Sequence, residues 1–513
     1  MSQYKKFLPF FLCIILIIIA LVYSWPLFKP GYFITDDGEW AIVRLTEMVR
    51  ELKDMQFPPR WSDFLNHGYG YPLFSFVYPF PFYFAAVLKL IGFSYVVSIK
   101  ILFILSGVLS ALFMFLFINK LTGPLAAFIA AVFYITAPYR LTDLYVRGSL
   151  GESLSFAIFP LIFYLTVVYN KTPSLIFSVL SSLSLAVLFL THNVMALLFT
   201  PVWILFVIVL NKKHHFGFIK ILFLALSISA YFIIPALFEK KYLLLSQVKL
   251  ADPRDYMLTA GQLADVFSRF QISALLFSLF ALRSPIYIFS LLMFLFFLFL
   301  TQIISLPLWL LPPLNFIDFP FRAFALVTFF TAILTSFLAK NKKTLYIGLI
   351  LAAFVVLDNI HNIRPGHFFQ KNDSFYFTND ATTTSMDELT PVWVKEKPKN
   401  RYQDKVEIIT GQAQVSDLNF NSKSITFSLN AQTTGRLQIN TIYFPGWKFK
   451  INNNNNMAIG FDNAPGLITI NYPAGESAIR GKFKETPVRI VSDLISLSAI
   501  IFILIKLAYV RKI

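Results

Sequence analysis

The stretch FLPFFLCIILIIIALVYSWPLFKPGYFITDDGEW, residues 7–40, places a long apolar run directly before a cluster of carboxylates. The run that ends at Tyr23 is apolar enough to cross a membrane. Lys5 and Lys6 precede it, and Ser24-Trp25-Pro26 is a poor signal-peptidase site because it lacks the small residues that the enzyme requires. We therefore predict an uncleaved first span with its N-terminus in the cytoplasm.

The composition indicates a multi-pass membrane protein. Hydrophobic residues make up 57% of the 513 residues and charged residues only 14%, which is too apolar for a soluble fold. The net charge of +17 does not indicate nucleic-acid binding, because much of it lies in short tracts beside apolar runs, where Lys and Arg mark the cytoplasmic side. Cys13 is the only cysteine, which excludes an internal disulfide and a cysteine-based metal site. The expected surroundings are membrane lipid, without nucleic acid.

We expect an all-α transmembrane bundle of about twelve spans. They cover residues 7–23, 98–118, 125–138, 154–169, 175–190, 194–210, 218–237, 266–282, 286–304, 321–338, 345–357 and 491–507.

Residues 74–91 are also apolar, but Pro79 and Pro81 interrupt them, and proline is costly inside a helix. If this segment is juxtamembrane or re-entrant and does not cross, the basic tracts all face the cytoplasm, as the positive-inside rule requires. These tracts are Lys120, Lys171, residues 211–215, residues 340–343 and Arg511-Lys512. Both termini are then cytoplasmic, and the protein is expected in the plasma membrane.

This topology gathers the polar segments on the extracytoplasmic face and divides the chain into three parts. A transmembrane domain (1–360) contains a first outer loop at about 25–97. Residues 361–489 form a β-rich extracytoplasmic domain, and residues 490–513 form a last span with a basic tail. Residues 424–429, 437–444, 447–451 and 467–472 alternate between apolar and polar side chains, which predicts a β-sandwich-like domain. The asparagine run 452–456 is expected to form a hairpin turn rather than a binding element.

Asp36 and Asp37 are the first candidates for chemistry. One interpretation is structural: acidic residues suit the N-terminus of the helix that we expect to begin near Ala41. The other is a catalytic carboxylate that faces a lipid-linked substrate. Because charges near the bilayer are costly, they tend to serve a site or a polar cavity.

A second polar cluster spans residues 139–152. Arg140 and Arg147 could hold a phosphate through forked hydrogen bonds, and Glu152 lies at the start of a predicted helix. Asp143 and Arg147 could equally form an i,i+4 pair that only fixes the loop.

Further candidates lie in other outer segments. His192 lies between two apolar runs, where a hydrogen-bonded interfacial residue is the alternative to a base. Arg322 lies at the outer end of a span and could clamp a phosphate, with Asp318 close by in sequence. Arg60, His67 and Tyr71 could line a sugar pocket or act as interfacial anchors.

Several motifs jointly resemble a bacterial and archaeal membrane-protein family labelled "6-pyruvoyl-tetrahydropterin synthase-related", whose architecture is similar to that of the GT-C superfamily of polyprenyl-phosphate-dependent glycosyltransferases. They are Asp36-Asp37-Gly38, Pro59-Arg60-Trp61, Gly68-Tyr69-Gly70-Tyr71-Pro72-Leu73-Phe74, Pro138-Tyr139-Arg140, Tyr145-Val146-Arg147-Gly148-Ser149-Leu150-Gly151-Glu152, Thr191-His192-Asn193, Phe319-Pro320-Phe321-Arg322 and Tyr443-Phe444-Pro445-Gly446-Trp447.

The resemblance implies a GT-C-like bundle in which an aspartate of the first outer loop acts on the acceptor or binds a metal. Asp36 and Asp37 are the matching positions, and Asp143 and Glu152 match the acids of the second outer loop, so these four are the candidate ligands of a divalent cation. Phe321 stands where the family usually has Trp. Glu388 stands where Tyr often precedes Leu-Pro, so the resemblance implies no role for it. We do not expect pterin-synthase activity, because the six histidines show no zinc-ligand spacing.

We therefore predict a glycosyltransferase that moves a sugar from a polyprenyl-phosphate donor to an extracytoplasmic acceptor. In this hypothesis Asp36 or Asp37 acts as general base, and Arg147 or Arg322 stabilises the phosphate leaving group. The alternatives are a transporter or flippase of lipid-linked sugars and a non-catalytic protein of envelope assembly.

Overall fold

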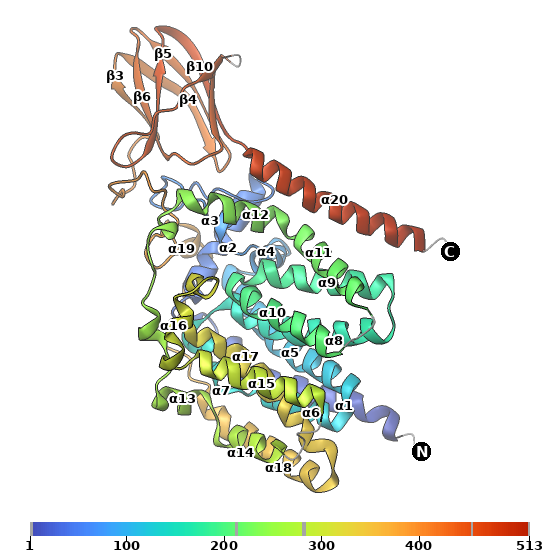
Figure 1. Cartoon of the computed structure of the whole chain (residues 1–513). Helices are drawn as coiled ribbons and strands as arrows, with labels where there is room; N and C mark the ends of the chain where they lie inside the picture. Colours follow the sequence, from blue (N-terminus) through green and yellow to red (C-terminus); the bar gives the residue numbers. More distant parts are fainter. Residues whose placement is uncertain (1–3, 211–213, 280–283, 453–454, 511–513) are drawn as a thin grey trace.

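The computed structural model describes residues 4–210, 214–279, 284–452 and 455–510. Long helices run side by side to form the transmembrane bundle, and a β-domain stands at one end of it (Figure 1). The first helix begins and the last helix ends on the same side of the bundle, away from α13, α16 and α19 (Figure 1). The predicted architecture, a helical bundle with a C-terminal β-sandwich-like domain and a final tethering helix, is confirmed.

The long helices of the bundle are the following: α1 (Tyr4–Tyr23), α5 (Tyr95–Leu121), α6 (Pro124–Ile135), α8 (Leu150–Lys171), α9 (Leu175–Thr191), α10 (Asn193–Leu210), α11 (His215–Ile228), α12 (Ala230–Glu239), α14 (Arg269–Ser278), α15 (Pro285–Leu300), α17 (Phe324–Ser336), α18 (Lys342–Asn359) and α20 (Pro487–Val510). Shorter helices join them: α2 (Gly38–Lys53), α3 (Leu73–Phe76), α4 (Phe80–Leu90), α7 (Pro138–Thr142), α13 (Ala260–Val266), α16 (Leu306–Trp309) and α19 (Asp373–Phe377).

Within the described residues, seven helical segments are long and apolar enough to cross a membrane, and two bent helix pairs raise this number to nine. α1 and α9 are apolar but slightly shorter, with apolar segments Phe7–Tyr23 and Leu175–Thr191. The span predicted at 266–282 is not one helix. Ser268 accepts a hydrogen bond in a capping box and starts α14 only at Arg269, and residues 280–282 lie outside the described part of the chain. The basic residues 211–213 and 511–513 also lie outside it.

The apolar segment 74–91 forms α3 and the 11-residue helix α4. At 1.5 Å per residue α4 is about 16 Å long, too short to cross a hydrocarbon core of about 30 Å. At its end, Lys89 forms a 2.7 Å ion pair with Asp373, which also accepts a hydrogen bond from the backbone of Tyr95 at the start of α5. The segment thus agrees with the prediction of a non-crossing element.

The β-domain consists of two antiparallel sheets. The larger has the order β4 (Ala413–Asn421), β5 (Ser424–Ala431), β10 (Gly475–Phe483), β7 (Trp447–Ile451) and β8 (Asn455–Met457), and the smaller has β3 (Val406–Thr410), β6 (Gly435–Ile442) and β9 (Leu467–Tyr472). Alternate side chains such as Phe427, Ile439 and Ile470 are buried, as the period of two predicts. β7 pairs with β8, so the asparagine run connects a hairpin; residues 453–454 of that run lie outside the described residues.

Residues that precede the sandwich pack on the first outer loop. β2 (Phe368–Phe369) pairs with β1 (Tyr32–Phe33), and α19 packs against α2. Leu389 donates a backbone hydrogen bond to the Tyr71 hydroxyl at 2.9 Å. This segment therefore joins the outer domain to the residues around Asp37.

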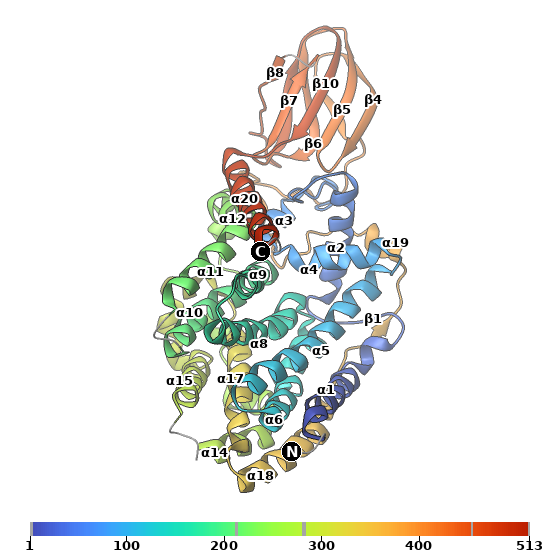
Figure 2. The same ribbon diagram turned by 90° about the vertical axis from the view of Figure 1, so that its right-hand side faces the viewer.

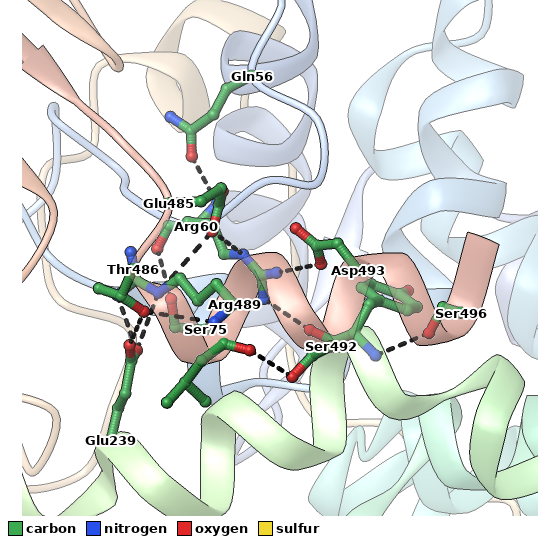
Figure 3. Close-up of polar contacts among 12 residues, drawn as sticks. Gln56, Arg60, Ser75, Glu239, Glu485, Thr486, Arg489, Ser492, Asp493 and Ser496 are labelled. Carbon is green, nitrogen blue, oxygen red and sulfur yellow. Dashed lines mark hydrogen bonds and ion pairs between the residues drawn. The ribbon is translucent and has the colours of Figure 1, made fainter. Parts of the chain in front are cut away.

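A buried ionic network fixes the start of α20 (Figure 3). Arg489 donates to Glu239 of α12 at 2.8 and 2.9 Å, and Arg60 of the first outer loop donates to Asp493 at 2.8 Å. Arg60 also lies 3.5 Å from Glu485. Burying an unpaired charge is costly, so each arginine of this network depends on its carboxylate partner. The ion pairs of Arg60 and Arg489 thus connect the first outer loop and α12 to the start of α20.

Candidate functional site

Two predicted segments that are distant in sequence meet at the end of the bundle opposite the first turn of α1. The backbone N–H groups of Asp36 and Asp37 donate to the carbonyls of Val146 and Arg147 at 3.0 and 2.8 Å. Gly148 follows with φ +64°, and a Cβ there would lie 2.4 Å from Thr35 Oγ1. Only glycine therefore permits this close approach of the two loops.

The second segment forms a buried cluster of charges beneath that contact. A π-helical turn, Asp143–Arg147, connects α7 to the loop before α8. Arg147 donates to Asp143 at 2.9 Å and to Glu152 at 2.7 Å. Tyr139 donates to Glu152 at 2.6 Å and Ser153 donates to Asp143 at 2.7 Å. Two carboxylates therefore neutralise Arg147.

A cavity of about 310 Å³ lies beside this cluster. Its walls come from helix ends and loops: the start of α2, the segment before α4, the start of α8, the junction of α9 and α10, the segment before α17, and the tether to the outer domain. The polar and aromatic residues that line it include Asp37, Trp40, Arg44, Tyr78, Ser149, His192, Asn193, Asp318, Phe319, Arg322, Thr384, Ser385 and Glu388.

Arg322, one of the two arginines that line the cavity, has unused hydrogen-bonding capacity. Its Nε is buried and has no hydrogen-bond partner in the described chain. The nearest carboxylate, Glu152, lies 3.9 Å away and already accepts hydrogen bonds from Arg147 and Tyr139. The guanidinium also stacks on Phe319 at 4.9 Å. Since a planar guanidinium suits a phosphate, this geometry provides an anion-binding group.

His192 lines the cavity as the first residue after α9. Its Nδ1 accepts a hydrogen bond from the backbone of Met195 at 3.2 Å, and its ring stacks on Tyr78 at 5.3 Å. A neutral ring in this position carries its proton on Nε2 and can donate from it. The histidine can thus orient a polar ligand.

The two aspartates of the first loop differ in position. Asp37 lines the cavity and is half-buried, whereas Asp36 is exposed and does not line it. Partial burial and the neighbouring Asp37 raise the pKa of Asp36. The geometry therefore favours Asp37, which the sequence did not distinguish from Asp36.

Besides Asp36 and the charge cluster of Asp143, Arg147 and Glu152, four further residues that we expected in the site do not line the cavity. Arg60 lies in the network at the start of α20, and Arg140 is buried over the Phe156 ring with Ser106 at 3.4 Å. His67 lies 3.4 Å from Asp380. The Tyr71 hydroxyl binds Thr384 and the backbone of Leu389, so it supports the cavity wall rather than the cavity itself.

The structure adds residues that sequence reasoning did not place in the site. Arg44 of α2 bonds the backbone carbonyl of Thr383 and lines the cavity. Glu388 lies in the wall, and its Oε2 accepts a backbone hydrogen bond from Met386 at 3.1 Å. Asp318 also lines the cavity, and burial raises its pKa. Arg44 could have been recognised because it lies among charged residues on the side of this helix opposite to Ile42 and Leu45.

The residues do not fit a divalent cation as arranged. Among the described side chains, no group of three or more His, Cys, Asp or Glu could hold a metal ion. Asp143 and Glu152, two of the predicted ligands, instead neutralise Arg147.

Comparisons with known proteins give partial likenesses. No family model matches the sequence. An uncharacterized protein of Lactococcus lactis subsp. cremoris is 25% identical over 252 residues, which is 46% of this chain and 41% of that protein. The chain therefore spans less than half the length of this curated relative.

Among solved structures, the oligosaccharyltransferase of Archaeoglobus fulgidus is similar in part. Its apo form has a TM-score of 0.45 and 13% identity, with 72% of this chain and 57% of that chain covered. Its complex with an inhibitory peptide and a dolichol-phosphate has a TM-score of 0.45 and 14% identity, covering 75% and 61%. At these values the likeness carries no assignment of activity, and the resemblance to the pterin-synthase-related family stays a prediction.

Proposed function

We propose that the chain is an integral membrane glycosyltransferase that transfers a sugar from a polyprenyl-phosphate carrier to an acceptor on the side of the β-domain. One observation carries the proposal. Arg322, with a buried guanidinium nitrogen that has no hydrogen-bond partner among the described residues, lines the same cavity as Asp37.

The chemistry requires one base and one anion-stabilising group. The acceptor hydroxyl oxygen forms a bond to the anomeric carbon while the bond from that carbon to the phosphate oxygen breaks. Asp37 takes the hydroxyl proton as general base, a role typically worth about 10²–10⁴-fold in rate. The polyprenyl phosphate leaves with the bonding electrons, and Arg322 stabilises its negative charge.

Arg147 positions these groups but does not bind substrate in this proposal. Its side chain is held by Asp143 and Glu152, and its backbone carbonyl accepts the hydrogen bond of Asp37. The charge cluster thus fixes the loop that carries the base. Apolar wall residues such as Phe76, Val77 and Phe316 suit a lipid-linked carrier.

The position of the cavity distinguishes this proposal from transport. Secondary transporters often bind substrate near the bilayer midplane, between paired repeats. Here the lining residues lie at helix ends and in the segments between spans. This arrangement supports chemistry at one face of the membrane.

The experiment uses the purified full chain in vesicles with a radiolabelled polyprenyl-phosphate hexose and a panel of hydroxyl acceptors, including short glycans and lipid-linked saccharides. The proposal expects label in a new glycosylated product and free polyprenyl phosphate in equal amount. Movement of the intact donor across the bilayer without product would instead support a flippase. Neither product nor movement with any acceptor would support a non-catalytic role in envelope assembly, and either outcome would overturn the proposal.

A further inference from the structure

A second cavity, of about 610 Å³, lies between residues 27–31 after α1, the first turns of α5 and the segment that leads into α19. It shares no lining residue with the cavity around Asp37 and Arg322. In the bundle, α19 lies on the side opposite to the first turn of α1 and the last turn of α20 (Figures 1 and 2). The cavity is therefore separate from the candidate active site but on the same face of the membrane.

Three lysines line this second cavity: Lys29, Lys100 and Lys371. Within the described chain, no ion pair joins any of the three to a carboxylate. The one carboxylate of the lining, Asp373, is paired with Lys89 at 2.7 Å. The lining therefore holds more positive than negative side chains, and of its lysines Lys371 also interacts electrostatically with Glu39, which lies outside the lining.

Lys100 is the buried lysine of this cavity, and its ammonium group is fixed by hydrogen bonds. It is buried, and its ammonium donates to the backbone carbonyls of Lys29 at 2.5 Å and Gly31 at 2.9 Å. An ammonium group has three N–H donors, so one remains after these two bonds. Lys100 thus holds the backbone of residues 29–31, which forms one wall of the cavity. Lys29, whose ammonium lies 4.6 Å from the Trp25 ring centre, is exposed at the rim.

The rest of the lining suits hydrocarbon. Val97, Ile101 and Ile104 follow one face of α5 and descend about 10 Å along it, less than half of a hydrocarbon core of about 30 Å. Phe28 in the wall and Trp25 beside it are exposed, as is typical of aromatic side chains at the level of lipid headgroups. The cavity thus combines a basic rim at headgroup level with an apolar wall that stays within one leaflet.

We propose that this cavity binds the phosphate headgroup of an anionic glycerophospholipid from the leaflet on the side of the β-domain. The phosphate lies among the three ammonium groups, and an acyl chain lies along Val97, Ile101 and Ile104. A zwitterionic lipid fits less well because its own ammonium has no unpaired carboxylate to meet there. Basic pockets between membrane helices on the cytoplasmic side bind anionic headgroups, and the same electrostatic attraction applies to this cavity.

The test compares retention of phosphatidylglycerol and phosphatidylcholine of identical chains by the purified full-length protein, measured by native mass spectrometry at equal lipid concentrations. Polyprenyl phosphate is included as a third lipid. The variants are Lys29→Gln, Lys371→Gln and the double variant. Lys241→Gln is the matched control, because Lys241 is exposed just after α12 and lines neither cavity.

The wild type should retain phosphatidylglycerol preferentially. Each single variant should weaken this retention about fivefold, or about 1 kcal/mol per lysine, and the double variant about 25-fold. Lys241→Gln should behave as wild type. Equal retention of the two glycerophospholipids, a double variant that loses polyprenyl phosphate instead of phosphatidylglycerol, or unchanged binding by a folded double variant would overturn the proposal. Sugar transfer is not measured, so the outcome does not depend on the proposed enzyme activity.

Discussion

Arg322 and Glu152 lie 3.9 Å apart at their closest atoms, too far for a hydrogen bond, although both side chains belong to one buried group of charges. Glu152 directs its hydrogen bonds to Arg147 and Tyr139. The two arginines are therefore not equivalent. Arg147 is held by two carboxylates, whereas Arg322 keeps capacity to bind an anion that enters the cavity.

Replacement of Arg322 should weaken binding of the phosphate carrier. Arg322→Gln removes the charge but keeps a polar side chain of related length, so we expect at least a tenfold loss of affinity for polyprenyl phosphate, because charge-assisted contacts are worth about 1.5–3 kcal/mol. Titration of the purified protein with the lipid measures this, and the thermal midpoint should change little. Unaltered affinity would show that another group binds the phosphate.

Replacement of Arg147 should act on stability instead. Arg147→Gln leaves Asp143 and Glu152 buried without their cation, and breaking such a pair typically costs about 3–5 kcal/mol. Thermal unfolding in detergent should show a large drop in the midpoint, with Arg480→Gln on the exposed face of β10 as the control. If Arg147→Gln unfolds like wild type but loses lipid binding, the division of roles between the two arginines is wrong.

A buried carboxylate on α2 should make stability depend on pH. Glu47 is buried beside Arg50, and burial raises its pKa to about 8. The unfolded value lies near 4.5, so the folded state holds the proton more tightly between these two values. Its stabilising contribution is therefore complete below about pH 4.5 and is lost as the pH rises through 8.

The variant Glu47→Gln should remove this dependence. Between pH 5 and pH 8 the wild type should lose stability relative to Glu47→Gln by a few kcal/mol, since one pKa unit corresponds to about 1.4 kcal/mol. Thermal midpoints of both proteins across this range measure the difference. Parallel curves would mean that Glu47 remains ionised in the folded state. Glu407→Gln on β3 serves as an exposed control.

Local patterns were enough to predict much of the fold. β7 and β9 match their predicted ranges because alternation of apolar and polar side chains is a property of neighbouring residues. The helix break near residue 268 was not predicted, because the prediction of a span at 266–282 relied on hydropathy alone and did not consider Ser268 as a helix N-cap. Strands β3, β4 and β10 were not identified because several of their residues are exposed and polar. β8 was not identified because its two asparagines belong to the run 452–456, which we expected to form a turn.

The candidate site was harder to predict because its composition depends on which charges cancel each other. In sequence, Arg60, Arg147 and Arg322 are all arginines of outer segments. Only the three-dimensional contacts show that Asp493 binds the first and that Asp143 and Glu152 bind the second. The position of Asp37 in the cavity, rather than Asp36, likewise follows from the pairing of this loop with residues 146–147.

The most direct measurement of the central claim is the single-turnover rate of sugar transfer by Asp37→Asn, with Asp36→Asn as the matched control one residue away. The account predicts that Asp37→Asn lowers the rate by about 10²–10⁴-fold at unchanged thermal stability, while Asp36→Asn stays within a few-fold of wild type. A wild-type rate in Asp37→Asn would contradict it.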